Sequence, residues 1–474
     1  MTFLAPLLFT AILGSLFVGT ITKAVPIRFY GLFIASLALP VGFSICSLLT
    51  FFAYLISPNQ GHLLALFTAI AMSVFFLTRI FCSSTHASPS LPSLKSSTRL
   101  QKTALGFCVI LWLFSFFLFF QLFVNVSLAN IFGGWDAKFF WNVKAKFFFR
   151  SPAEWRNMFD SAIGWTHQDY PLLVPGSVAW GWNWTGKELQ IWPATVAFSF
   201  LFSIALFILW YLSSATHLIT GLLASAFFMT VGAYSFWGVS QYADVPLSFF
   251  MTASGIILLE ALRSKNLSLW MLAGWLAGCA AWTKNEGLFF IGWIGLVAGS
   301  LQYFYRIKDK AWLKPLFSLG LGLSIPFFAI LILKEVLAKT GDYLGSGRGA
   351  GSYFQAIFMD PQKSLYILKS FPVYMFDSSS WNGLWIFYFS ALFLLFCVKK
   401  ARQSDTWVTG TLALLILFGY FVILHTSPHN VAWQIQTALQ RLLLHAGGLA
   451  LIFTFEVFGR MTISESNPTQ RSQA

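Results

Sequence analysis

The chain has 474 residues, of which 57% are hydrophobic, 19% aromatic and only 10% charged, and its mean hydropathy is +0.71. Soluble domains carry about 25% charged residues, so this composition excludes an ordinary soluble protein and indicates a membrane protein. The net charge of +14 comes without a soluble basic domain, so we exclude nucleic acid as a partner and attribute the charge to basic loops that orient the chain in a bilayer.

Long apolar runs follow one another through most of the chain, and a spanning helix needs about 20 mostly apolar residues. This length rule predicts about thirteen spans, and hence an all-α polytopic membrane protein. The predicted spans are residues 4–22, 29–56, 62–82, 104–126, 190–211, 217–237, 245–262, 268–282, 287–304, 315–335, 381–398, 406–425 and 439–458.

Lysine and arginine gather in alternate loops, and acidic residues gather in the others. The positive-inside rule makes the basic side cytoplasmic, which predicts an N-terminus outside and a C-terminus inside an inner cell membrane. Two long segments, residues 127–189 and 336–380, then lie outside, and loops of this length are usually functional. We therefore divide the chain into four parts: residues 1–103 (three helices and a cytoplasmic linker), 104–335 (a catalytic core with the first outer segment), 336–380 and 381–474.

The first candidate site lies in the outer segment that follows the fourth predicted span, in the sequence GWDAKFFWNVKAKFFFR, Gly134 to Arg150. In a helix, Asp136, Phe140 and Lys144 share one face, so two charges interrupt an otherwise aromatic surface. An interfacial amphipathic helix explains lysines beside anionic lipid, but it does not explain Asp136. A charge placed against an apolar environment favours a functional role for this carboxylate.

Two further motifs combine acidic residues with proline. The sequence HQDYPLLVP begins at His167, and its prolines Pro171 and Pro175 argue against a continuous helix. Its His167 and Asp169 either bind a polar substrate or cap and solvate the loop. In QYADVP, Asp244 is either the N-cap of the next helix or a carboxylate that faces Asp136.

Three other outer segments carry basic residues. In WTKNEGLFF, Lys284 and Glu286 either pair and snorkel or contact a phosphate and a sugar hydroxyl. The glycine-rich GDYLGSGRGAGSYF lacks the ending of a P-loop, and we expect a mobile outer lid with Arg348 as an anion contact. Arg441, at the start of the last predicted span, is either a phosphate ligand or an interface anchor.

These segments, taken in order, resemble the GT-C class of membrane glycosyltransferases, in particular the bacterial relatives of protein mannosyltransferases and of the lipid A aminoarabinose transferase, which are family 39-like. The resemblance rests on the outer location that the segments share, and it runs from the fourth predicted span to the last. The segments are GWDAKFFWNVKAK, HQDYPLLVP, QYADVPLSFF, AWTKNEGLFF and the residues around Arg441.

The resemblance implies transfer of a sugar, with inversion, from a polyprenyl-phosphate donor to an acceptor hydroxyl of a lipid, glycan or protein at the outer, periplasmic face. By match of context, Asp136 takes the role of the base and Asp244 that of a second acid. The residues implied to bind substrate are Lys144, His167, Asp169, Tyr170, Asp244, Lys284, Glu286, Arg348 and Arg441.

The sequence departs from the family pattern in one respect, and two other functions remain open. Asp136 is followed by Ala137 where the family has paired acids, so we assign no metal ligand and no cofactor, and a divalent metal ion stays an open possibility. One alternative is an enzyme like the O-antigen polymerases or ligases. The other is a transporter or flippase of lipid-linked glycans, although transporters place their charges near the midplane of the bilayer.

Overall fold

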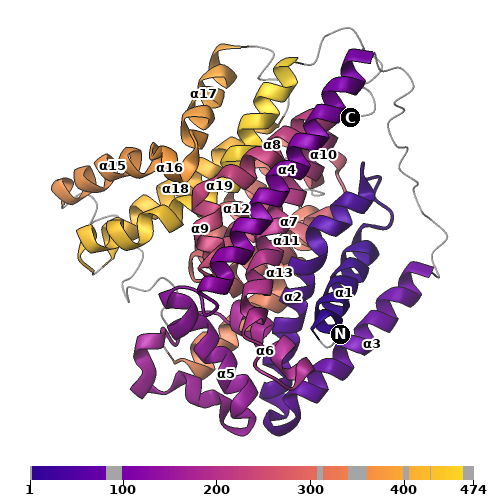
Figure 1. Cartoon of the computed structure of the whole chain (residues 1–474), viewed down its shortest axis with the longest axis vertical. Helices are drawn as coiled ribbons and strands as arrows, with labels where there is room; N and C mark the ends of the chain where they lie inside the picture. The colour runs from indigo at the N-terminus through magenta and orange to yellow at the C-terminus, as the bar shows by residue number, and fades with distance from the viewer. Residues whose placement is uncertain are drawn as a thin grey trace.

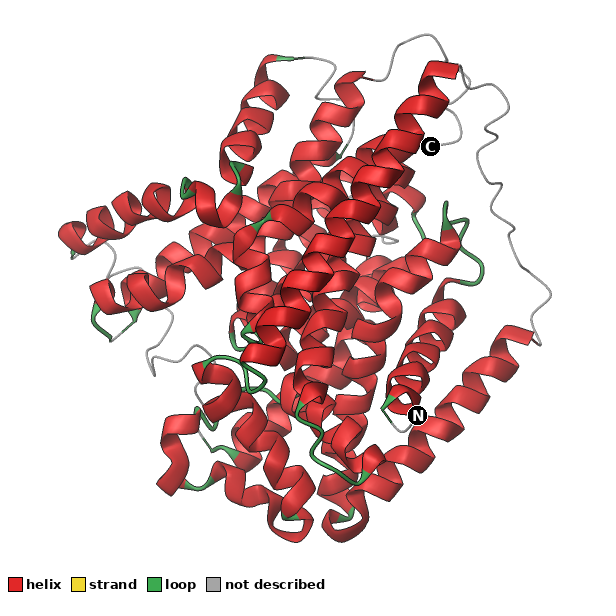
Figure 2. Cartoon of the chain, in the orientation of Figure 1, coloured by secondary structure: helices red, strands yellow, loops and turns green. Residues whose placement is uncertain are grey.

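The computed structural model describes residues 3–81, 99–306, 313–339, 360–398, 405–427 and 429–462. Every regular element in these ranges is a helix (Figure 2). Nine of the described helices are long and apolar enough to cross a membrane, which confirms the prediction of an all-α, multi-pass membrane protein. These helices are α1 (Leu4–Thr22), α2 (Tyr30–Ile56), α3 (Gly61–Phe81), α4 (Arg99–Ala129), α7 (Ile191–Ala215), α10 (Asp244–Ser264), α13 (Leu313–Leu331), α18 (Thr406–Thr426) and α19 (Val431–Thr462).

The other predicted spans are helical but differ from simple crossings. The span predicted at 217–237 is a pair of helices, α8 (Leu218–Thr230) and α9 (Gly232–Val239), that meet at an angle of 58°. The chain bends at Val231, and a Cβ atom at the next residue, Gly232, would lie 2.5 Å from the carbonyl oxygen of Ser379. The count of about thirteen spans and the orientation in the membrane therefore remain predictions. The three remaining helices at predicted spans are α11 (Leu267–Thr283), α12 (Glu286–Arg306) and α17 (Leu384–Cys397).

The predicted outer segment 127–189 is largely helical, and its helices lie together at the lower end of the molecule in Figure 1. They are η3 (Ala137–Trp141, a π-helical turn), α5 (Asn142–Arg150), η4 (Pro152–Phe159), η5 (Ser161–Thr166) and α6 (Leu173–Thr185). No continuous helix runs through the HQDYPLLVP motif, as its prolines predict, because η5 ends at Thr166 and α6 begins at Leu173, with Pro175 in the first turn of α6. Proline is tolerated there because an N–H in the first turn has no acceptor within the helix.

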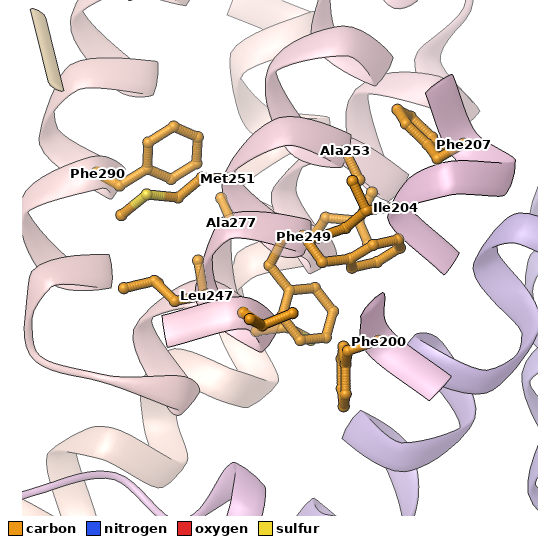
Figure 3. Packing of buried hydrophobic residues seen from close by; sticks show 14 of the residues in the cluster. Phe200, Ile204, Phe207, Leu247, Phe249, Met251, Ala253, Ala277 and Phe290 are labelled. Carbon is orange, nitrogen blue, oxygen red and sulfur yellow. The ribbon is translucent and has the colours of Figure 1, made fainter. Parts of the chain in front are cut away.

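The centre of the bundle is α10, which is buried along nearly its whole length. Its Phe249 packs against Phe200 and Phe207 of α7, with ring centroids 6.1 and 6.2 Å apart (Figure 3). Met251 lies beside Phe290 of α12 in the same view. The core thus fixes α10 against its neighbours, and α10 carries Asp244 at one end.

Small residues allow the closest helix contacts in the bundle. A Cβ atom at Gly274 of α11 would lie 1.9 Å from the carbonyl oxygen of Leu319, and one at Gly322 of α13 would lie 1.9 Å from that of Met271. Such close backbone approach is the usual way in which helices associate in lipid, where apolar side chains gain little from leaving the solvent. The α11–α13 pair therefore holds the turn after α11 in place.

The C-terminal part of the chain adds five described helical elements to α19. One of them, α15, packs against α18 and α19 and projects to the left of the bundle in Figure 1. It occupies most of the described part of the predicted outer segment 336–380, which also includes the end of η7 and most of α16, since residues 340–359 lie outside the described ranges. The elements are η7 (Ile332–Leu337, also π-helical), α15 (Pro361–Met375), α16 (Ser378–Trp381), α17 and α18.

Candidate functional site

Six polar side chains from four parts of the chain meet at the end of the bundle near α5. We call them the Arg441 cluster: Asp136, Asp244, Lys284, Glu286, Arg441 and His445. Arg441 joins the two aspartates, because its Nη1 atom lies 2.5 Å from Asp136 Oδ2 and 3.9 Å from Asp244 Oδ2. Two carboxylates predicted separately from the sequence thus share one guanidinium.

The position of Asp136 depends on two glycines that precede it. Gly133 has a φ of +69°, a conformation that suits glycine, and Gly134 donates its N–H to the carbonyl oxygen of Ser240 at 2.9 Å. A Cβ atom at Gly134 would lie 2.7 Å from the ring of Tyr242. The segment in front of η3 is therefore tied to the turn between α9 and α10, and this turn brings Asp136 close to Asp244.

Asp244 does not act as a helix cap, so that interpretation of the QYADVP motif is wrong. It is the first residue of α10, and its side chain bonds no N–H of its own helix. Instead its Oδ1 atom accepts hydrogen bonds from Lys284 Nζ at 2.9 Å and from His445 Nε2 at 3.1 Å. Because Nε2 donates, the other ring nitrogen of His445 accepts the hydrogen of the Tyr420 hydroxyl, 2.6 Å away.

Lys284 and Glu286 form an ion pair, as one interpretation of their motif predicts. Lys284 Nζ lies 3.0 Å from Glu286 Oε1 and 2.9 Å from Asp244 Oδ1, and the lysine side chain is buried. It lies in the turn between α11 and α12, after the last residue of α11. With two carboxylates at contact distance, Lys284 holds Asp244 in position rather than offering a free positive charge.

Arg441 is the most available cation of the cluster. The expectation that it begins the last helix is wrong, because α19 starts ten residues earlier, at Val431. Its guanidinium lies over the rings of Trp237 and Tyr242, at 5.5 and 5.3 Å from their centroids. Two atoms of the cluster are buried without a hydrogen-bond partner, namely Arg441 Nε and Asp244 Oδ2. Unpaired buried polar atoms are costly, and a bound water or ligand can supply the partners.

A second group lies beside the Arg441 cluster. We call it the Lys144 cluster: Lys144, His167, Asp169, Tyr170, Asn285 and Lys334. The amine of Lys144 donates to the carbonyl oxygens of His167 at 2.6 Å and Tyr170 at 3.3 Å. Asn285 Nδ2 donates to Asp169 Oδ2 at 2.6 Å. Since Asn285 lies between Lys284 and Glu286 in the chain, the two clusters are adjacent.

The Lys144 cluster is electrostatically unusual. Burial lowers the pKa of Lys144 to about 7, and Lys334 adds to this effect while Asp169 opposes it. Burial also lowers the pKa of His167, whose ring stacks on Tyr170 at 4.7 Å. A buried lysine that titrates near neutral pH is typical of functional sites.

The structure therefore brings together eight of the nine residues that the resemblance implies for substrate binding, together with Asp136. The ninth, Arg348, lies outside the described residues. Four neighbours were not predicted: Tyr420, His445, Asn285 and Lys334. Two of them had a signal in the sequence. His445 follows Arg441 by four residues and so shares its helix face, and Lys334 is a lysine inside an apolar run. No pattern singles out Tyr420 or Asn285.

Comparisons with protein-family models, with curated proteins and with solved structures found no match to this chain. Within the described ranges, no three histidine, cysteine, aspartate or glutamate side chains are arranged so that they could hold a metal ion. The functional argument therefore rests on the residues of the two clusters and on the resemblance of the sequence motifs.

Proposed function

We propose that this protein is a membrane glycosyltransferase that moves a sugar from a polyprenyl-phosphate donor to an acceptor hydroxyl at the outer face of the membrane. The observation that carries the proposal is the geometry of Arg441. It bridges two carboxylates, it is only partly buried, and its Nε–H has no acceptor. A phosphate oxygen of the donor supplies the acceptor that this N–H lacks, because arginine binds phosphate through pairs of N–H groups.

Donor binding also explains how Asp136 becomes a base. In the structure Asp136 is paired with Arg441, so its carboxylate is occupied by the guanidinium. When the donor phosphate takes over the guanidinium, Asp136 is released beside the bound sugar. Arg441 stays between the phosphate and Asp244, because Asp244 is held by Lys284 and His445.

The transfer itself is a single displacement. The acceptor oxygen forms a bond to the anomeric carbon, while the bond from that carbon to the phosphate oxygen breaks on the opposite side. Asp136 accepts the proton of the acceptor hydroxyl, and the electron pair of the broken bond stays on the polyprenyl phosphate. Arg441 stabilises the negative charge that grows on the leaving oxygen. The products are an inverted glycoside and polyprenyl phosphate.

The alternative of a flippase is favoured by one observation. The hydrogen-bonded chain from Tyr420 through His445 to Asp244 runs inward from the Arg441 cluster and is fully buried. Buried chains of titratable groups also serve as proton relays in transporters. The two functions differ in whether the bond between sugar and phosphate breaks.

The experiment uses the purified protein in lipid vesicles with a panel of radiolabelled polyprenyl-phosphate sugars and a membrane extract as the source of acceptor. Release of polyprenyl phosphate by the parent, and its loss in Asp136→Asn, are the expected results. Glu154→Gln is the matched control, because Glu154 is an exposed acid of the same outer segment. Release that Asp136→Asn does not reduce would overturn the assignment of the base. Movement of intact donor across the bilayer without release would favour the flippase.

A further inference from the structure

A cavity of about 440 Å³ lies at the end of the bundle opposite the Arg441 cluster. Asp244 begins α10, whereas Lys265, which lines the cavity, directly follows its last residue. A helix of this length spans about 30 Å, so the cavity and the candidate active site are separated by the thickness of a bilayer core. In the predicted orientation the cavity faces the cytoplasm.

Four polar side chains from different elements line the cavity. Lys265 and Lys314 are exposed, Asp405 is half-buried, and none of the three has an ion pair within the described ranges. The fourth, Gln302 of α12, is only 5% exposed, and its Oε1 atom has no hydrogen-bond partner. The cavity therefore offers two cations for a phosphate and two acceptors for a group that carries hydrogen-bond donors.

An apolar groove continues from the cavity along α13. The groove shares Leu267 and Lys314 with the cavity. Its other apolar residues, Leu313, Phe317 and Leu321, follow one another at intervals of four along one face of α13, and they are 51, 75 and 55% exposed. A polar cavity that opens onto an apolar stripe has the shape of a lipid, with the headgroup in the cavity and one chain on the stripe.

Basic residues near the cytoplasmic surface commonly serve only to orient a membrane protein. That role explains Lys265 and Lys314, but it does not explain a buried acceptor or an acidic residue in the same cavity. A purely anionic headgroup would be repelled by Asp405. A headgroup with both a phosphate and an ammonium group satisfies all four side chains, because the ammonium carries the N–H donors that Asp405 and Gln302 Oε1 need.

We propose that this cavity binds one aminophospholipid, of the phosphatidylethanolamine class, with its phosphate at Lys265 and Lys314 and its ammonium at Gln302 and Asp405. Its acyl chain lies along Leu313, Phe317 and Leu321. The site is independent of the proposed transferase site, since it shares no residue with either cluster.

The test compares the retention of two lipids by native mass spectrometry of the purified, full-length protein. The probes are phosphatidylethanolamine and phosphatidylcholine of the same chain length, which differ in that the trimethylammonium of choline has no N–H. We expect the parent to retain phosphatidylethanolamine about tenfold more strongly, the usual effect of one or two hydrogen bonds to a charged group. Equal retention of the two lipids would overturn the proposal, and so would stronger retention of phosphatidylglycerol.

Two variants locate the binding. Lys265→Gln with Lys314→Gln should weaken retention about 25-fold, since each lysine near a phosphate headgroup contributes about a factor of five. Arg99→Gln with Lys102→Gln is the matched control, because it removes two exposed charges from the start of α4 and should change nothing. If the control pair weakened retention equally, the effect would be general surface charge and the proposed site would be wrong.

Substitutions of Gln302 test the contribution of the headgroup separately from that of the rest of the lipid. Gln302→Leu should reduce the preference for ethanolamine over choline several-fold, since only Asp405 then accepts from the ammonium, whereas Gln302→Glu keeps an acceptor oxygen and should retain the preference. A parallel thermal melt identifies any variant that fails to fold, and Gln302→Glu still tests the site if Gln302→Leu does not fold. Displacement of the lipid by free phosphoethanolamine at equal concentration would mean a soluble ligand and would contradict a lipid site.

Discussion

Helix α19 contributes to two ion clusters, one at Arg441 and His445 and the other at Glu456 and Arg460, and the two clusters differ in how completely their hydrogen bonds are made. At the end away from the candidate active site, Glu456 accepts hydrogen bonds from Tyr211 at 2.9 Å, Arg263 at 3.2 Å, Thr406 at 3.1 Å and Arg460 at 2.6 Å. We call this the Glu456 cluster, and we describe it as closed because both carboxylate oxygens have hydrogen-bond partners.

The Arg441 cluster also takes residues from α10 and α19, but some of its buried polar atoms have no hydrogen-bond partner, and we describe it as open. Arg441 Nε and Asp244 Oδ2 are buried without partners, and so is Asn285 Oδ1 in the adjacent Lys144 cluster. A satisfied buried network mainly supports the fold, whereas an unsatisfied one has a cost that a ligand can remove. The comparison assigns a structural role to the Glu456 cluster and ligand binding to the Arg441 cluster.

The largest expected effect is on the rate of sugar transfer, and it follows from a substitution in the Arg441 cluster. Asp136→Asn removes the base but keeps the size of the side chain, so the rate of sugar transfer should fall about 10³-fold, within the usual range for loss of a general base. The thermal stability of the protein should stay close to that of the parent. A transfer assay with radiolabelled donor checks the rate, and an unchanged rate would remove Asp136 from the mechanism.

The corresponding substitution in the Glu456 cluster should reduce the stability of the protein. Glu456→Ala removes a fully buried carboxylate and leaves Arg263 with Glu260 as its remaining ion-pair partner, which should destabilise the protein by about 3–5 kcal/mol. The protein that remains folded should transfer sugar at the parental rate. Thermal unfolding in detergent measures the loss, and a stable variant without activity would contradict the structural role of this cluster.

A smaller effect concerns the pH dependence of stability. The pKa of Lys144 is about 7 in the folded protein and 10.5 in its ordinary state, so between these values the unfolded chain binds more protons. Stability should therefore rise by about 1 kcal/mol per pH unit between pH 7 and 10, and it should be insensitive to this group below pH 7. Lys144→Met should abolish the slope.

Thermal unfolding across this pH range checks the prediction. Lys187→Met is the matched control, because Lys187 is an exposed lysine of the same outer segment. If the parent and Lys144→Met showed the same slope, Lys144 would not titrate in this range.

Most of the helices and most of the candidate site residues followed from the sequence, because apolar runs and misplaced charges are local signals. The errors came from contacts between distant segments. Asp244 bonds Lys284 and His445 instead of its own helix. A sequence shows that a charge is unusual, but the partner of that charge is set by how the helices pack.

The bend between α8 and α9 has the same origin. Its apolar sequence predicts one straight span, but Gly232 packs against the carbonyl oxygen of Ser379, far along the chain. The π-helical turn η3 likewise shifts the positions after Asp136 relative to those of an ideal helix. Neither feature leaves a periodic signal in its own segment.

The central claim is that the open cluster holds a phosphate, and the most direct measurement is the binding of polyprenyl phosphate to the purified protein. Arg441→Ala should weaken the binding about 30-fold, the usual effect of losing a charged hydrogen-bond donor to phosphate. Arg460→Ala is the matched control, since Arg460 lies on the same helix and pairs with Glu456 at the closed end. Weaker binding in Arg441→Ala alone would support the account. Equal binding by the parent and Arg441→Ala would contradict it.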